Sequence, residues 1–228
     1  MPSGEELAIV VLSLKVAVVA VAASLPFAIG VAWLLARRDF LGKTALDAVV
    51  HLPLVLPPVV VGYLLLLALG RHAPLGRALD AIGIVFAFRW TGAALAAAVM
   101  SFPLVVRAVR LSMEAIDPRL EAAGRTLGAS RWRVFATVTL PLAWPGIVTG
   151  ALLGFARSLG EFGATITFVA NIPGETETLP LAIYAYTQVP GADVAALRLS
   201  ILSVLLSLGA LAASEWLVRR RKAASLDA

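Results

Sequence analysis

Five long apolar runs constrain this chain more than any other feature of its sequence. Each extends over about 20 residues or more, the length that a helix needs to cross about 30 Å of hydrocarbon. The runs are Leu7 to Ala36, Val49 to Leu69, Thr91 to Val109, Val134 to Phe155 and Leu199 to Val218. They predict an all-α membrane protein with five transmembrane helices, built as a single domain over residues 1–228.

The composition agrees with lipid as the main solvent. Hydrophobic residues make up 60% of the chain and charged residues 14%, with a mean hydropathy of +0.92, whereas soluble domains are about a quarter charged. The chain has no cysteine and two histidines, which leaves no thiolate or histidine-built metal site and no cysteine nucleophile. We therefore expect no catalytic residue, no metal and no cofactor bound by this chain.

The basic residues give a net charge of +5 and predict the orientation of the chain. They cluster at the ends of the apolar runs rather than along one polar face, so a nucleic-acid partner is not expected. If the N-terminus is outside and the C-terminus cytoplasmic, the cytoplasm receives Arg37, Arg38 and Lys43, then Arg107, Arg110, Arg119, Arg125, Arg131 and Arg133, then Arg219, Arg220, Arg221 and Lys222. The outside keeps Arg71, Arg77, Arg89, Arg198 and, on one placement, Arg157.

Two regions do not fit simple spans. Residues 160–196 contain apolar pieces too short to cross a bilayer, interrupted by turn residues and acids. Because irregular backbone at membrane depth must be buried in protein or face a wet cavity, we interpret this stretch as an outer-side, partly re-entrant segment; the alternative is a sixth span with both termini inside. In the second run, Pro53, Pro57 and Pro58 predict a kink or break.

A loop between the third and fourth runs carries strong helix signals at residues 117–131. Asp117 and Pro118 predict a helix start, and Gly128 predicts its left-handed end. Ser130 is placed to cap the next helix. Glu121 and Arg125, at i and i+4, are expected to pair. This narrow amphipathic helix suits either a groove on another protein or the lipid surface.

Polar residues near the end of the fourth run and beyond it are candidates for a pathway or gate. Arg157 and Glu161, at i and i+4, predict either an ion pair that orders the bundle or a gate. Uncharged donors that could hold an anion weakly are Thr149, Thr165, Thr167 and Asn171. Gly146, Gly150 and Gly154 predict a close helix contact, within one chain or between two copies.

The loop resembles the EAA motif of ATP-binding-cassette importer permeases. The matching residues are Glu121, Ala122, Ala123, Gly128, Val138, Leu140 and Pro141. The acid stands seven positions before the glycine, one more than in that motif. Further stretches are similar to the molybdate and tungstate branch: residues 52–58, 125–130, 153–165 and 171–176, including Gly-Glu-Phe-Gly-Ala-Thr and Asn-Ile-Pro-Gly.

The resemblance implies a bacterial or archaeal inner-membrane permease working by alternating access. It implies a homodimer, two cytoplasmic ATPase subunits that use ATP and Mg, and an external solute-binding protein. Sulfate or thiosulfate is the nearest alternative cargo. An ion-coupled secondary transporter is disfavoured because no internal repeat is visible, and an intramembrane enzyme because no catalytic cluster is. Gly42-Lys43-Thr44 lacks the earlier glycine of a phosphate-binding loop, so hydrolysis should belong to a partner.

Overall fold

A computed structural model describes residues 4–224, and this part of the chain contains helices and loops but no strand. Four helices are long and apolar enough to cross a membrane, and one bent pair can make a fifth span. The crossing elements are α1 (Gly4–Arg37), the bent pair α2 (Lys43–Val55) and α3 (Pro58–Leu69), α5 (Trp90–Glu114), the continuous run Arg131–Leu159, and α11 (Asp193–Ala224). The predicted all-α multi-pass fold is confirmed.

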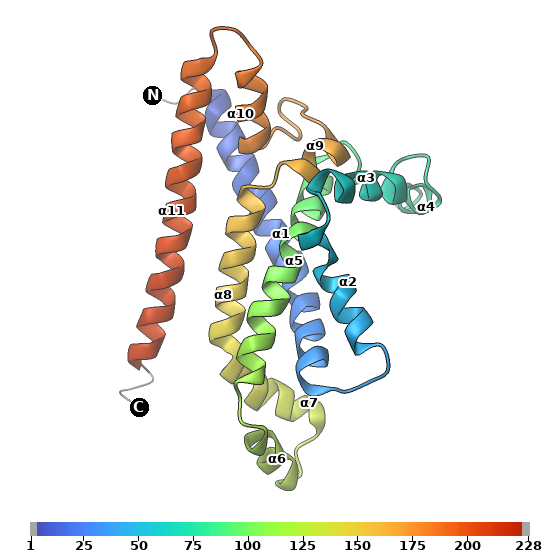
Figure 1. The fold of residues 1–228 in the computed structure, drawn as a ribbon, viewed down its shortest axis with the longest axis vertical. Helices are drawn as coiled ribbons and strands as arrows, with labels where there is room; N and C mark the ends of the chain where they lie inside the picture. Colours follow the sequence, from blue (N-terminus) through green and yellow to red (C-terminus); the bar gives the residue numbers. More distant parts are fainter. Residues whose placement is uncertain (1–3, 225–228) are drawn as a thin grey trace.

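Helices α1, α5 and α8 (Leu140–Leu159) run side by side along the long axis and form the centre of the bundle (Figure 1). Small residues let α8 approach α5 closely. A Cβ at Gly146 would overlap the side chain of Ser112, and one at Gly154 would lie 2.7 Å from a methyl of Val105. The glycine face that the sequence left unassigned is thus a contact with α5 inside the chain.

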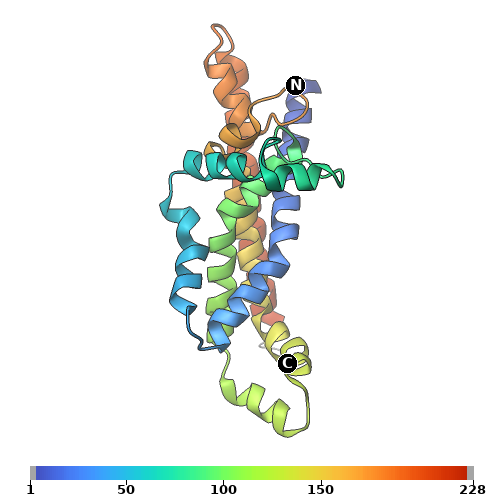
Figure 2. The ribbon, with the colours of Figure 1, turned by 90° about the vertical axis from the view of Figure 1, so that its right-hand side faces the viewer.

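The second apolar run does not cross as one straight helix. Its two halves, α2 and α3, meet at a bend of 114°, and α3 lies across the bundle axis in both side views (Figures 1 and 2). Leu56 and Pro57 each precede a proline and have extended backbone, with ψ of 143° and 132°, because a following proline ring disfavours the helical conformation. The predicted break is confirmed and falls at Pro57 and Pro58, whereas Pro53 lies inside α2 and does not interrupt it.

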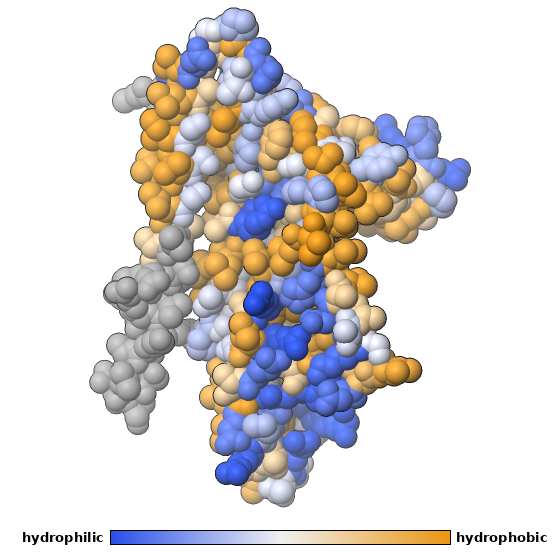
Figure 3. Space-filling model, viewed as in Figure 1, coloured by the Kyte–Doolittle hydropathy of each residue, from blue (hydrophilic) through white to orange (hydrophobic). Residues whose placement is uncertain are grey.

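The two ends of the bundle are built from different elements. One end holds the start of α1, α3, α4 (Pro74–Asp80), α9 (Gly163–Val169) and α10 (Leu179–Thr187), and the other end holds α6 (Pro118–Thr126) and α7 (Arg131–Val134) (Figures 1 and 2). Hydrophilic surface gathers around α6 and α7 (Figure 3). The side chains of Arg219 to Lys222 lie outside the described part of the structure.

Residues 160–192 form two short helices and irregular loops at the end away from α6, and the predicted segment 160–196 is four residues too long because α11 begins at Asp193. Helices α9 and α10 have seven and nine residues, so neither can span a bilayer and the alternative of a sixth span is not supported. Helix α9 packs against α3, and α10 packs against α11. The buried hydroxyl of Ser13 accepts a 2.7 Å hydrogen bond from the Leu179 amide, which ties the start of α10 to α1.

Candidate functional site

Helix α6 begins and ends as its sequence predicts. The Asp117 side chain accepts a hydrogen bond from the Arg119 amide at 2.9 Å, and Pro118 occupies the first turn. At the other end Gly128 has a φ of +83°, its amide donates to Arg125 O, and the Ala129 amide donates to Gly124 O. These two bonds form a Schellman motif, which satisfies carbonyls at the helix end. The short helix is therefore fixed by local chemistry at both ends.

The chain returns to the bundle through α7 and a π-helical turn, η1 (Phe135–Thr139). Ser130 caps α7 by accepting a hydrogen bond from the Arg133 amide at 3.3 Å, as predicted. The π turn, which the sequence analysis did not anticipate, ends directly before Leu140-Pro141. Because Pro141 lacks an amide donor and its ring crowds the preceding turn, widening the helix there relieves the clash.

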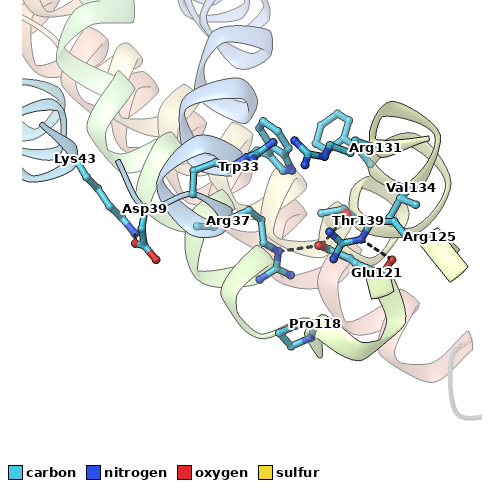
Figure 4. Close-up of a pocket in the computed structure, with 13 residues that line it drawn as sticks. Trp33, Arg37, Asp39, Lys43, Pro118, Glu121, Arg125, Arg131, Val134 and Thr139 are labelled. Carbon is cyan, nitrogen blue, oxygen red and sulfur yellow. Dashed lines mark hydrogen bonds and ion pairs between the residues drawn. The ribbon is translucent and has the colours of Figure 1, made fainter. Parts of the chain in front are cut away.

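Glu121 ties α6 to the bundle through two contacts. Its Oε1 accepts hydrogen bonds from Arg37 Nε at 2.9 Å and from Thr139 Oγ1 at 2.8 Å (Figure 4). Arg37, at the end of α1, also donates to Ile116 O at 3.3 Å. The expected carboxylate pair with Arg125 does not form, and Arg125 Nε instead donates to the Glu121 backbone carbonyl at 3.3 Å. The better-placed guanidinium of Arg37 occupies the carboxylate.

One face of α6 packs on the bundle while another remains uncovered. A Cβ at Gly124 would lie 3.2 Å from a methyl of Val134, so the missing side chain allows α6 to sit close to the following helix. Away from this contact, Leu120 is 50% exposed and Leu127 89% exposed. Ala122 and Ala123 are exposed too. Exposed leucines on a short helix at the polar end offer an apolar contact surface to another protein.

The remaining residues of the motif shape the return into the bundle. Val138 and Leu140 are half-buried, and Leu140 packs against the buried cluster that includes Ile147 and Met113. Pro141 is exposed. These three residues therefore position η1, and through it the Thr139 hydroxyl that reaches Glu121.

A basic cavity of about 360 Å³ lies between the end of α1, the α1–α2 loop, α6 and α7 (Figure 4). Its wall includes the Arg37–Glu121 pair and an aromatic cluster. Trp33 stacks on Trp132 at 6.1 Å between ring centroids and meets Phe135 edge-on at 5.7 Å. The cavity is thus bounded on one side by charge and on another by aromatic rings.

Arg157 and Glu161 lie toward the opposite end of α8, where they form the ion pair that the sequence suggests. Arg157 Nη1 is 2.7 Å from Glu161 Oε2, and the Glu161 side chain is 2% exposed. The other carboxylate oxygen accepts a hydrogen bond from the Ala164 amide at 2.8 Å, at the start of α9. One buried carboxylate therefore orders the junction of α8 and α9.

The four uncharged candidates are not brought together into one site. The hydroxyls of Thr149 and Thr167 each donate to a carbonyl of their own helix, at 2.9 Å. Thr165 is buried at 2% exposure, and the Asn171 amide is 3.5 Å from Glu177 Oε1. Thr149 lies in the middle of α8, whereas Thr165 and Thr167 lie on α9. Their role in a pathway stays a prediction.

Two contacts of the site were missed by sequence reasoning. Arg37 lies 84 positions before Glu121, and no local pattern links them. Thr139 faces Glu121 because of the π turn, for which Pro141 was the available signal. Among the described residues, no group of histidine, cysteine and acidic side chains could hold a metal ion.

Comparison with known proteins places these features in a family. The family model described as binding-protein-dependent transport system inner membrane component matches residues 24–223. The molybdenum transport system permease protein ModB of Escherichia coli (strain K12) is 63% identical over 92% of both chains. The sulfate transport system permease protein CysT of the same strain is 41% identical over 71% of this chain and 58% of its own.

The fold also matches a solved transporter. A bacterial alginate ABC transporter, crystallised in complex with an alginate pentasaccharide-bound periplasmic protein, contains a chain that superposes with a TM-score of 0.75. The alignment covers 96% of this chain and 80% of the other at 18% identity. The fold of this chain is therefore shared with a chain of that ABC transporter.

Proposed function

The chain belongs to the family of binding-protein-dependent transport system inner membrane components, and on that premise we propose that it is the membrane-spanning subunit of an ATP-driven molybdate importer. It is a transport subunit and not an enzyme. The observation that carries the cargo assignment is the 63% identity to a molybdenum permease across nearly the whole of both chains. Tungstate, a dianion of the same shape, is the closest companion cargo.

Sulfate is the weaker alternative. The sulfate permease is 41% identical and less than two thirds of its length is covered. Both cargoes are tetrahedral dianions, so a pathway of hydrogen-bond donors accepts either one. We assign most of the discrimination to the solute-binding protein that delivers the oxyanion.

The assembly that we propose is two copies of this permease, two ATPase chains and one external binding protein. The polar end bearing α6 faces the cytoplasm, and the N-terminal end faces outward. The segregation of Arg37, Arg38, Arg131 and Arg133 to the α6 end supports this orientation. ATP and Mg are used by the ATPase partners. The exposed Leu120 of α6 and the exposed Leu127 at its C-cap supply the docking surface for each ATPase.

In this proposal the ATPase is coupled to the membrane helices through the contacts that hold α6. An ATPase that moves α6 also moves Glu121, and the two bonds of its carboxylate pass the displacement to Arg37 on α1 and to Thr139 before α8. Both helices belong to the centre of the bundle. We propose that this connection converts closure of the ATPase pair into alternation between outward-open and inward-open states.

The candidate pathway and gate residues have smaller proposed roles. The Arg157–Glu161 pair fixes the α8–α9 junction and acts as a gate element rather than as an anion ligand, since a carboxylate repels a dianion. Thr149, Thr165, Thr167 and Asn171 are proposed as weak donors along the path. Thr149, Thr167 and Asn171 now donate hydrogen bonds to neighbouring protein groups. In this proposal they would donate to the anion instead as it passes.

The test is ATP-dependent uptake by the complete transporter in liposomes, with molybdate, tungstate and sulfate offered separately. Gly128→Val should lower uptake, because left-handed backbone costs a branched residue more than about 1 kcal/mol, although no atom within 4 Å obstructs a Cβ. Gly128→Asn is the matched control, since asparagine tolerates that conformation. No ATP-dependent uptake from an assembled wild-type complex rejects the importer assignment; preferred uptake of sulfate overturns only the cargo.

A further inference from the structure

The basic cavity beside α6 carries more positive charge than its own acids can balance. Five basic and two acidic side chains line it. The acids are engaged: Glu121 pairs with Arg37 at 2.9 Å, and Asp39 with Lys43 at 2.9 Å. The other three cations in its wall are Arg38, Arg125 and Arg131.

Among the residues whose side chains the structure describes, these three guanidiniums have no carboxylate partner. Arg125 donates only to a backbone carbonyl, and Arg38 lies over the Trp33 ring at 5.5 Å. Arg131 lines the cavity from the start of α7 (Figure 4). Guanidinium groups present paired donors that match the oxygens of phosphate and carboxylate groups. The cavity is therefore suited to an anion with several oxygens.

The surroundings identify the kind of anion. Trp132 is 74% exposed beside Trp33, and Phe40 and Leu41 in the neighbouring loop are 38% and fully exposed. Tryptophan and basic residues at the end of a spanning helix mark the headgroup level of a bilayer. The docking leucines of α6 do not line the cavity, so its opening is separate from the surface assigned to the ATPase.

We propose that this cavity binds the headgroup phosphate of an anionic phospholipid of the inner leaflet, such as phosphatidylglycerol. Basic pockets between helices on the cytoplasmic side are suited to such headgroups. The inference rests on the proposed orientation of the permease. The bound phosphate sits beside the Glu121–Arg37 connection and braces it, so membrane composition influences how firmly α6 is held.

The test measures lipid retention by native mass spectrometry of the purified permease–ATPase complex, mixed with equal amounts of phosphatidylglycerol and phosphatidylcholine. The wild-type complex should retain phosphatidylglycerol preferentially. In the double variant Arg38→Gln/Arg131→Gln this preference should fall by about 30-fold, and each single variant should lose part of it. The matched control Arg119→Gln/Arg133→Gln removes two charges from the same end but none from the cavity wall, and should keep the preference. Thermal stability and ATPase association show that each variant is folded.

Three results would overturn the proposal. Equal retention by wild type and the double variant would mean that the cavity is not the site. Displacement of the lipid by excess inorganic phosphate would mean a site for free anions. Retention by the full-length permease alone but not by the complex would mean that acidic groups of the ATPase fill the cavity. The readout requires no cargo, so these failures are distinct from failure of molybdate uptake.

Discussion

Removing the Glu121 carboxylate should loosen α6 without touching the surface that docks the ATPase. Glu121→Gln keeps the size of the side chain and an acceptor oxygen but removes the charge that holds Arg37. The side chains of Glu121 and Arg37 are 12% and 13% exposed. Breaking a buried pair costs about 3–5 kcal/mol and losing an exposed pair at most about 1 kcal/mol, so we expect about 2 kcal/mol here.

In the docking that we propose, the ATPase binds the ordered position of α6, so this loss should appear as a weaker affinity. If the ordered position of α6 becomes about 2 kcal/mol less stable relative to the loosened one, its population falls and the Kd for the ATPase rises by at most about 30-fold. The measurement is binding of labelled ATPase to the permease in nanodiscs. Arg37→Gln should weaken binding by a similar factor, and the double variant Glu121→Gln/Arg37→Gln by no more than either single variant, because all three break the same connection.

The control for charge alone is Arg77→Gln in α4, at the opposite end of the bundle, which should leave the Kd within twofold. The reasoning is refuted if Arg37→Gln binds like wild type while Glu121→Gln loses tenfold or more. That pattern would mean that the carboxylate contacts the ATPase directly and that Arg37 is a bystander.

Two further predictions concern the bundle. Gly146→Ala should destabilise the permease by about 1–3 kcal/mol, because the added methyl overlaps Ser112 on α5. Gly160→Ala is the control, since its methyl meets open space and should be nearly neutral. Thermal unfolding in detergent measures both variants, and equal melting temperatures would contradict the contact. Glu161→Gln should lower the free energy of unfolding by about 3 kcal/mol in the same assay, since it leaves Arg157 beside a neutral group in a largely buried site. The double variant Arg157→Gln/Glu161→Gln should recover part of this lost stability. No recovery would contradict a mutual ion pair.

Features controlled by neighbouring residues were predictable from the sequence. Asp117 and Gly128 set the ends of α6, and Pro57 sets the break before α3, because capping and proline sterics act over a few residues. The partner of Glu121 was not predictable. Its local candidate, Arg125, follows the helix spacing rule, but folding brings Arg37 closer from a distant helix end.

Other features depend on which surfaces meet in three dimensions. The glycine face of α8 was recognisable as a contact surface, yet only the packed bundle shows that α5 fills it. The π turn before Pro141 has two causes: the helix must accommodate the proline, and Leu140 must pack against the buried cluster. The second cause depends on the folded bundle and cannot be seen in the sequence. For the pathway candidates no spacing argument could work, because Thr149 lies on α8 and Thr165 on α9, and sequence spacing does not relate residues on different helices.

The 114° bend between α2 and α3 has a consequence for how the chain is made. During synthesis, residues 49–69 emerge as one apolar segment, long enough to enter the bilayer as a single insertion unit. Helix α3 cannot reach its final contacts then, because its Gly62 packs within a side chain's width of Ala164 on α9, which the ribosome delivers much later. Biogenesis therefore has an early insertion step and a late rearrangement, and a nascent chain stalled before α9 would leave an apolar helix exposed to quality-control proteases.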